Sequence, residues 1–256
     1  MAKENQYQLN KRIEAFIREK DSKNESFSKA DISFIQQYEG AGGQGSKGAT
    51  GEGVLYEFYT PDYICDLMYE LAIRHGYDGG TILDPAIATG RLIKPFPDKM
   101  KITGFEISPV TARICEITYP GATIHNNYFE TAFLNAPRFT ERIRSQQKPT
   151  WLTDYPFSLV IGNPPYGKYK NKYSSFFKIP KMQQVELMFI YYGLKLLKSD
   201  GLLVFITSSN FLRNGISYTK EKTEIGKMAE LIDAYRLPPV FKTSQVPTDI
   251  IVLKRK

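Results

Sequence analysis

Four consecutive residues of this chain could do chemistry: Asn163, Pro164, Pro165 and Tyr166, which follow a strand-like apolar run at residues 158–161. In an open α/β sheet, ligands bind beyond the carboxyl ends of the strands. Each proline fixes φ near about −65° and has no N–H, and Asn163 is driven to an extended conformation because it precedes a proline. The sequence therefore predicts a stiff loop that presents two acceptors, the Asn163 amide oxygen and the Pro164 carbonyl, beside the ring of Tyr166.

This arrangement suits a planar group that carries an NH2. The two acceptors take the two amino hydrogens, and the tyrosine ring stacks on the adjoining π system. An aromatic amine is a poor nucleophile because its lone pair is delocalised into the ring. Fixed acceptors favour a pyramidal nitrogen and accommodate the positive charge that develops on it during attack. A proline-rich turn after a buried strand is the alternative interpretation of the same four residues, so the rest of the chain has to decide.

The composition of the whole chain limits the possible classes of protein. Its 256 residues suffice for one α/β domain with an appendage. A formal net charge of +7 and 13% aromatic residues fit a nucleic-acid binder without singling one out. The two isolated cysteines predict neither a disulfide framework nor a metal site. The start of the chain lacks a signal-peptide core, and no apolar run approaches the roughly 18 residues that span a membrane, so we expect a cytoplasmic protein.

Residues 1–53 are predicted to form an N-terminal extension. Apolar stripes at helical spacing indicate two short helices: Ile13, Phe16 and Ile17 in the first, Ile32 and Ile35 in the second. The glycines of residues 40–53 lack the strand–loop–helix context and the Gly-Lys-Ser/Thr ending of a phosphate-binding loop. We therefore expect this stretch to be a connector or a lid.

Strand and helix patterns alternate from residue 54 onward, and residues 54–256 are predicted to form a single catalytic domain. The predicted strands are 81–84, 101–106, 122–125, 158–161, 201–207, 229–236 and 248–253, and the predicted helices include 108–118, 183–198 and 221–230. A further helix is expected after Thr60-Pro61-Asp62, with Thr60 as its N-cap and Pro61 at its first position. This rhythm predicts a doubly wound, mostly parallel α/β sheet of seven strands with an antiparallel hairpin at one edge.

The first three strands of this domain end in residues suited to a nucleotide-like ligand. Asp84 is followed by a turn of small residues that reaches Gly90 and lets a ligand approach the backbone. Glu106 ends the second strand 22 residues later, and an acid at about this spacing binds ribose hydroxyls in nucleotide folds. Asn127 follows the third strand with an amide that suits an adenine edge, and Tyr128 follows it with a ring that suits stacking.

The order of these motifs resembles the class I, S-adenosylmethionine-dependent N6-adenine DNA methyltransferases of the γ type, over residues 54–256. The resemblance implies a Rossmann-like fold and S-adenosylmethionine as the cofactor. It also implies which residues contact that cofactor: Tyr59, Thr60, Asp84, Ala86, Gly90, Glu106, Ile107, Asn127 and Tyr128. The catalytic residues that it implies are Asn163, Pro164, Pro165 and Tyr166.

Two residues depart from the pattern of that family. Ala88 stands where the first glycine of the turn is usual. If that position needs φ > 0, alanine costs about 1 kcal/mol or more, whereas at negative φ it is harmless. Asn127 stands where the family usually has an aspartate, which keeps the acceptor and loses a charge. We expect weaker recognition of the cofactor adenine in consequence.

A basic and aromatic run, residues 168–178, follows the four catalytic candidates directly. Lysines interleaved with aromatic rings suit a phosphate backbone and splayed bases, whereas a solvated loop is the alternative. The target adenine has to leave the base stack to reach the loop. Residues expected to contact the nucleic acid or the target base are Tyr166, Lys168, Lys170, Lys172, Asn210 and Phe211.

The sequence thus predicts methyl transfer to the N6 amino group of a flipped adenine in DNA. RNA-base and protein-glutamine methyltransferases remain alternatives, as does a degenerate DNA-binding subunit, which the departures Ala88 and Asn127 would suit. The chain stops soon after its last predicted strand, so we expect recognition to come from loops near 167–182 and 208–222, from residues 1–53, or from an additional domain or specificity subunit. Restriction-modification, phage-borne and regulatory roles are all open.

Overall fold

A computed structural model describes residues 5–40, 59–134, 150–167, 182, 184–213, 218–239 and 247–256. The α-helices are α1 (Gln6–Ser22), α2 (Lys29–Ile35), α3 (Asp62–Arg74), α4 (Pro109–Thr118), α6 (Val185–Leu196) and α7 (Thr219–Met228). The strands are β1 (Ile82–Asp84), β2 (Ile102–Phe105), β3 (Thr123–His125), β4 (Phe157–Gly162), β5 (Leu197–Ser208), β6 (Ala229–Arg236) and β7 (Thr248–Arg255). Short 3-10 helices follow Gly90, Asp98 and Tyr128: η1 (Arg91–Ile93), η2 (Lys99–Lys101) and η3 (Phe129–Phe133).

The strands form one sheet in the order β3-β2-β1-β4-β5-β7-β6. The first five strands of this order pair in parallel, and β7 pairs antiparallel with both β5 and β6. The class of sheet, the seven strands and the antiparallel pairing at this edge are as predicted. The strand order reverses between β1 and β4, and ligands bind beside such a point in doubly wound sheets.

Apolar residues cover both faces of the sheet, as buried parallel strands require. One face packs against α6, through strand residues that include Leu83, Val160, Leu203 and Phe205. The opposite face packs against α3, through strand residues that include Ile82, Leu159, Ile161 and Val204. The alternation along β4 and β5 follows from the two-residue period of a strand. The protein therefore has three layers, with the sheet in the middle.

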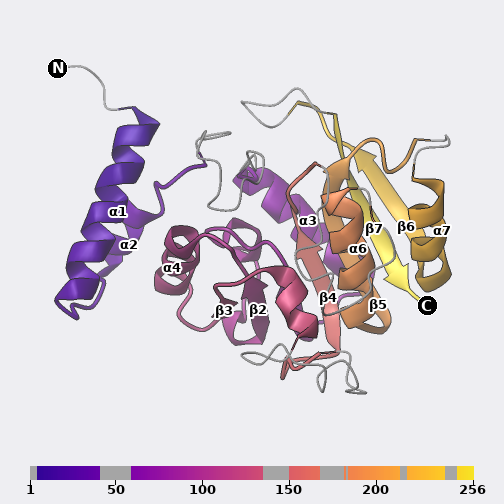
Figure 1. Cartoon of the computed structure of the whole chain (residues 1–256), viewed down its shortest axis with the longest axis horizontal. Helices are drawn as coiled ribbons and strands as arrows, with labels where there is room; N and C mark the ends of the chain where they lie inside the picture. Colours follow the sequence, from indigo (N-terminus) through magenta and orange to yellow (C-terminus); the bar gives the residue numbers. More distant parts are fainter. Residues whose placement is uncertain are drawn as a thin grey trace.

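The N-terminal helices α1 and α2 pack against α4 rather than against the sheet, and lie at one end of the molecule in Figure 1. Ile13, Ile17 and Ile35 meet Ile114 and Ile117 in a separate apolar cluster. Both helices begin with a capping box, which satisfies backbone N–H groups that a helix start leaves unpaired. The two predicted helices are thus confirmed, and the extension is docked on the α/β domain through α4.

The expected start of α3 is wrong by one position. The helix begins at Asp62 with Pro61 as its N-cap, and no described side chain caps it. The Thr60 hydroxyl oxygen instead accepts a hydrogen bond from Nδ2 of Asn163, at 3.2 Å. A contact with a residue 103 positions away has therefore replaced the local capping bond that the sequence suggested.

Two predicted segments lie outside the described residues: most of the glycine-rich stretch 40–53, and the basic run that contains Lys168, Lys170 and Lys172. Within the part of the chain that the structure does describe, no helix is long and apolar enough to cross a membrane.

Candidate functional site

Most of the predicted site residues that the structure describes lie at or beyond the carboxyl ends of five strands, whereas Tyr59 and Thr60 precede α3. Because β1 to β5 are parallel neighbours in the sheet, these ends meet at one edge. The residues at this edge are Asp84, Ala86 and Gly90 after β1, Glu106 and Ile107 after β2, Asn127 and Tyr128 after β3, Asn163 to Tyr166 after β4, and Asn210 and Phe211 after β5. The fold therefore places the two predicted halves of the site along one edge of the sheet.

Asp84 lies fully buried at the end of β1. Its Oδ1 accepts a hydrogen bond from the Ala86 N–H at 3.0 Å, while its Oδ2 has no partner among the described residues. Burial raises the pKa of Asp84 to about 8, and the nearby Glu106 carboxylate adds to that rise. An unpaired buried carboxyl oxygen is costly by itself, so this site suits a ligand with a positive charge or a donor.

Glu106 fixes the shape of the turn that follows β1. Its Oε2 accepts from the Ala88 N–H at 3.0 Å, and its Oε1 accepts from the Ser108 N–H at 2.7 Å. Ala88 adopts a φ of +50° and Gly90 a φ of +82°. The sequence left the sign of φ at Ala88 open, and the structure selects the strained conformation, which costs an alanine about 1–2 kcal/mol. We call residues 84–90 the cofactor turn, after the cofactor contact that the sequence predicts for them.

The remaining predicted cofactor residues lie beyond β2 and β3. Ile107 leaves 40% of its surface exposed, which suits contact with an apolar face of a ligand. The Asn127 Oδ1 accepts from the N–H of Tyr128 at 2.9 Å, so its amide is partly engaged with its own backbone. Asn126, which the sequence did not single out, donates from Nδ2 to the Glu106 carbonyl at 2.8 Å and connects the ends of β2 and β3.

Asn163 is bonded at both ends of its amide. Its Nδ2 donates to the Thr60 hydroxyl oxygen at 3.2 Å, and its Oδ1 accepts from the Tyr166 hydroxyl at 3.0 Å. Burial raises the pKa of Tyr166, and the negative charge of Glu186 adds to the rise, so the phenol stays protonated and donates. An amide oxygen accepts two hydrogen bonds, so Oδ1 can serve Tyr166 and an amine hydrogen together. We call residues 163–167 the target loop, after the contact with a target base that the sequence predicts for them.

Glu186 is a buried acid beside the target loop that the sequence analysis missed. It is 6% exposed, its Oε1 accepts from the Ser208 hydroxyl at 3.0 Å, and its Oε2 has no partner in the described part of the chain. Burial raises its pKa. Its neighbour Val185 donates from its N–H to the Gly167 carbonyl at 2.8 Å. The signal that could have found it is its position as the one acid in the apolar helix Val185–Leu196.

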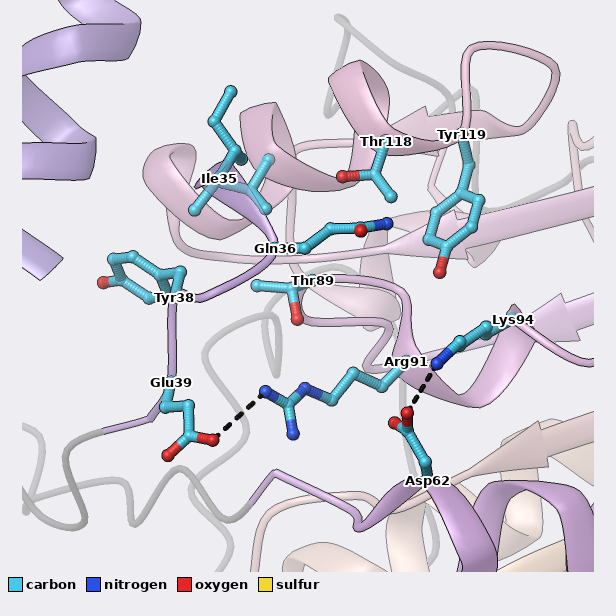
Figure 2. A pocket seen from close by; sticks show the side chains of 11 residues that line it. Ile35, Gln36, Tyr38, Glu39, Asp62, Thr89, Arg91, Lys94, Thr118 and Tyr119 are labelled. Carbon is cyan, nitrogen blue, oxygen red and sulfur yellow. Dashed lines mark hydrogen bonds and ion pairs between the residues drawn. The ribbon is translucent and has the colours of Figure 1, made fainter. Parts of the chain in front are cut away.

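A pocket of about 310 Å³ separates the N-terminal extension from the cofactor turn (Figure 2). Arg91 forms an ion pair with Glu39 at 3.6 Å, and Lys94 forms one with Asp62 across the same pocket. The Arg91 guanidinium also lies 5.4 Å from the centre of the Tyr59 ring. Glu39, near the end of the described part of the extension, thus contacts Arg91, the residue that directly follows the cofactor turn. The sequence did not predict this contact.

The residues expected to contact nucleic acid are only partly described. Asn210 is exposed, and its carbonyl accepts from the Lys222 ammonium at 3.2 Å. Phe211 is partly buried against the core cluster that contains α6. Both residues follow β5, which pairs with β4 in the sheet, so they lie at the same edge as the target loop. Their contact with a base stays a prediction.

Comparisons with known proteins agree with this arrangement. Residues 100–241, more than half of the chain, match the family described as "Eco57I restriction-modification methylase". A similar curated protein is the "Defense against restriction protein B" of Escherichia phage P1, 27% identical over 218 residues that cover 82% of this chain and 9% of that protein. Another is the "Type I restriction enzyme MpnII methylase subunit" of Mycoplasma pneumoniae, 25% identical over 222 residues that cover 78% of this chain and 40% of that protein. This chain therefore spans less than half the length of each.

Solved structures show the same fold. A chain from Listeria monocytogenes described as a class I S-adenosylmethionine-dependent methyltransferase superposes with a TM-score of 0.61 at 17% identity, covering 90% of this chain and 69% of that one. At this identity the likeness concerns the fold alone, and that fold is the predicted one.

Proposed function

The chain belongs to the Eco57I restriction-modification methylase family, and from that premise we propose that it methylates the N6 amino group of a flipped adenine in DNA. The family and the class I fold imply S-adenosylmethionine as the cofactor. The observation that carries the proposal is the Asn163 amide, bonded at both ends and placed at the same edge of the sheet as the cofactor turn.

The residues at the carboxyl ends of β1 and β2 fit this cofactor. The ligand carries ribose hydroxyls and two positive charges, and the edge offers two carboxyl groups, Asp84 and Glu106, one of which has a buried oxygen without a described partner. The residues that would hold it are Tyr59, Asp84, Ala86, Gly90, Glu106, Ile107, Asn127 and Tyr128. The hydroxyl of Thr60, which the sequence also assigned to the cofactor, accepts a hydrogen bond from Asn163. Bound S-adenosylmethionine supplies an electrophilic methyl group on a sulfonium.

The target loop supplies the positioning of the nucleophile. Oδ1 of Asn163 and the Pro164 carbonyl accept the two hydrogens of the N6 amine, which localises the nitrogen lone pair. The same acceptors stabilise the positive charge that grows on nitrogen as the new bond forms, and one amine proton leaves afterwards. Tyr166 and Phe211 stack on the base after it has left the helix.

The relatives that this chain matches are longer than it is, which bears on the partners we propose. One relative is a methylase subunit of a type I restriction enzyme, and this chain covers only part of it. We expect DNA as the substrate and a further domain or a specificity subunit as the source of sequence recognition. A basic composition, with a formal net charge of +7, supports the nucleic-acid substrate.

Methyl transfer from labelled S-adenosylmethionine to unmethylated plasmid DNA, structured RNA and protein extract, run in parallel, tests the proposal. Label recovered from DNA as N6-methyladenine is the expected result. Label in RNA or protein alone would retain the positioning chemistry and overturn the substrate. Absence of label with bound cofactor would direct the search to a missing recognition subunit.

One observation favours a second candidate, a degenerate DNA-binding subunit. Ala88 holds a φ of +50°, and a turn that relaxes from this conformation without ligand would have to be strained again on binding, which would lower the affinity for the cofactor. Calorimetry with S-adenosylmethionine separates the two candidates. A measurable dissociation constant supports the enzyme, and absence of binding at millimolar ligand supports the degenerate subunit.

A further inference from the structure

We infer that Thr60 is a positioning residue whose hydroxyl holds the NH2 end of the Asn163 amide, so that the amide oxygen stays in place for the target amine. The inference rests on the proposed function, because the same amide is its subject. An asparagine amide has two ends of nearly equal size: an oxygen that accepts hydrogen bonds and an NH2 that donates them. Only the oxygen can take an amine hydrogen, so the reaction requires one of two amide orientations.

The hydroxyls of Thr60 and Tyr166, which bond to the two ends of the amide, differ in how well they accept and donate hydrogen bonds. The Thr60 hydroxyl, 3.2 Å from Nδ2, is aliphatic and keeps its oxygen lone pairs localised, which makes it a good acceptor. The Tyr166 hydroxyl, 3.0 Å from Oδ1, is a phenol whose lone pair is delocalised into the ring, which makes it a good donor and a poor acceptor. An amide turned by 180° would set its NH2 against the phenol, a poor acceptor, whereas the Thr60 hydroxyl can accept or donate. Tyr166 therefore selects the orientation, and Thr60 holds the NH2 end of the amide in place.

The Thr60 side chain has little freedom to move. It is 4% exposed, it is β-branched, and it precedes Pro61, which restricts its backbone. Its carbonyl also accepts a hydrogen bond from the Cys65 thiol at 3.7 Å, in the first turn of α3. The acceptor for Nδ2 is therefore fixed in space by α3, independently of the loop that carries Asn163.

Position matters here as much as orientation, since a misplacement of about 1 Å at a reacting group lowers a rate by up to about 100-fold. The loop that carries Asn163 is attached to the end of β4, whereas its anchor lies at the start of α3. The bond to Thr60 thus ties the Asn163 amide to the start of α3 as well as to the end of β4. Removal of its hydroxyl should lower the rate of the chemical step.

The test compares Thr60→Val, which keeps the shape and loses the hydroxyl, with Thr60→Ser, which keeps the hydroxyl. We expect Thr60→Val to lower kcat about tenfold, with the KM for DNA and the Kd for S-adenosylmethionine within threefold of the parent chain. Thr60→Ser should remain within threefold in all three constants. Thr103→Val is the matched control, because Thr103 is a buried threonine whose hydroxyl bonds to Asp154, ahead of β4.

A second pair of variants measures the coupling. Tyr166→Phe keeps the ring and removes the donor at the other end of the amide. Its effect on kcat and that of Thr60→Val should be less than additive in the double variant, because both act through one amide orientation. Strict additivity, or a Thr60→Val kcat within threefold of the parent value, would overturn the inference. A loss confined to cofactor affinity would overturn it as well.

The NMR signals of the Asn163 side-chain NH2 provide a readout that needs no activity. Asn163→Ala assigns them by their disappearance from the amide spectrum of the full chain. Thr60→Val should shift and broaden them, whereas Thr60→Ser and Thr103→Val should leave them in place. If the parent chain methylates nothing and these signals still respond, the proposed function fails and the positioning contact stands; if they do not respond, the contact itself is refuted.

Discussion

The cofactor turn and the target loop lie on the same edge of one sheet, yet they are held by different kinds of contact. In the cofactor turn, Asp84 bonds to a backbone N–H two residues away and Glu106 bonds to one 18 residues away. In the target loop, the side chain of Asn163 bonds to a hydroxyl 103 residues away. In the first region, carboxylates accept from backbone N–H groups; in the second, side chains bond to one another, and one of them comes from a distant segment.

This difference predicts which kinds of substitution disrupt each region. Backbone N–H groups are present whatever the side chain, so the cofactor turn is sensitive to φ and to the space around each Cα. The target loop needs particular side-chain atoms, so it is sensitive to chemical identity. Substitutions can therefore be chosen that affect one region and spare the other.

The largest effect is expected for Asn163→Ala, which removes the acceptor and leaves the cofactor turn intact. Methyl transfer should fall by about 1,000-fold or more, because the acceptor contributes to the transition state. Calorimetry should show a Kd for S-adenosylmethionine within a few-fold of the parent value. Near-normal turnover of this variant would refute the proposed mechanism.

Gly90→Ala should break the cofactor turn through shape alone. A Cβ there would lie 2.6 Å from Cε2 of Tyr119 and 2.8 Å from Sγ of Cys115, at a φ of +82°. We expect a loss of about 3 kcal/mol in the free energy of unfolding. Gly226→Ala in α7 is the control, since no described atom lies within 4 Å of its Cβ, and it should gain up to about 1 kcal/mol. Urea unfolding measures both, and equal stabilities would contradict the expectation.

Asp84 should make the stability of the ligand-free protein fall as pH rises. Its pKa is about 8 in the fold against an ordinary value of 3.8, so between these limits the unfolded chain has lost the proton that the folded chain keeps. The contribution is complete below pH 4 and declines by at most about 1.4 kcal/mol per unit up to pH 8. Asp84→Asn should flatten this slope in urea titrations at pH 5, 6, 7 and 8. Parallel slopes in parent and variant would show that the carboxyl is ionised throughout.

The smallest effect is expected for Ala88→Gly, which relieves a φ of +50°. Relief of about 1–2 kcal/mol is partly offset by the greater entropy of glycine in the unfolded chain, which leaves a gain of between zero and about 1 kcal/mol. The affinity for S-adenosylmethionine should rise by the part of this strain that the ligand-free turn releases and binding restores. Asn24→Gly, at a φ of +52° in the N-terminal extension, is the control that should leave that affinity unchanged. A weaker affinity in Ala88→Gly would show that the alanine methyl contacts the cofactor.

Element prediction succeeded where the periodicity of apolar residues is strong. Each predicted strand overlaps a strand of the sheet, and the two N-terminal helices lie where their isoleucine stripes placed them. The capping role of Thr60 was wrong, because a distant amide competes for the same hydroxyl. Glu186 and its partner Ser208 were missed: Glu186 is the one acid in an apolar helix, but an acid in the first turn is also what a helix start favours, and the bond to Ser208 is a tertiary contact. The assignment of roles to the site residues stays a prediction.

The sequence by itself determined the alternation of strands and helices, and with it the edge of the sheet where Asp84, Glu106 and Asn163 appear. This was possible because periodicity, turn residues and strand ends are local properties. Only the tertiary structure decided that Ala88 takes a positive φ, that Thr60 contacts Asn163, and that Glu39 reaches Arg91. These contacts join segments that lie far apart along the chain, and their geometry is fixed by packing against the sheet, which no local pattern encodes.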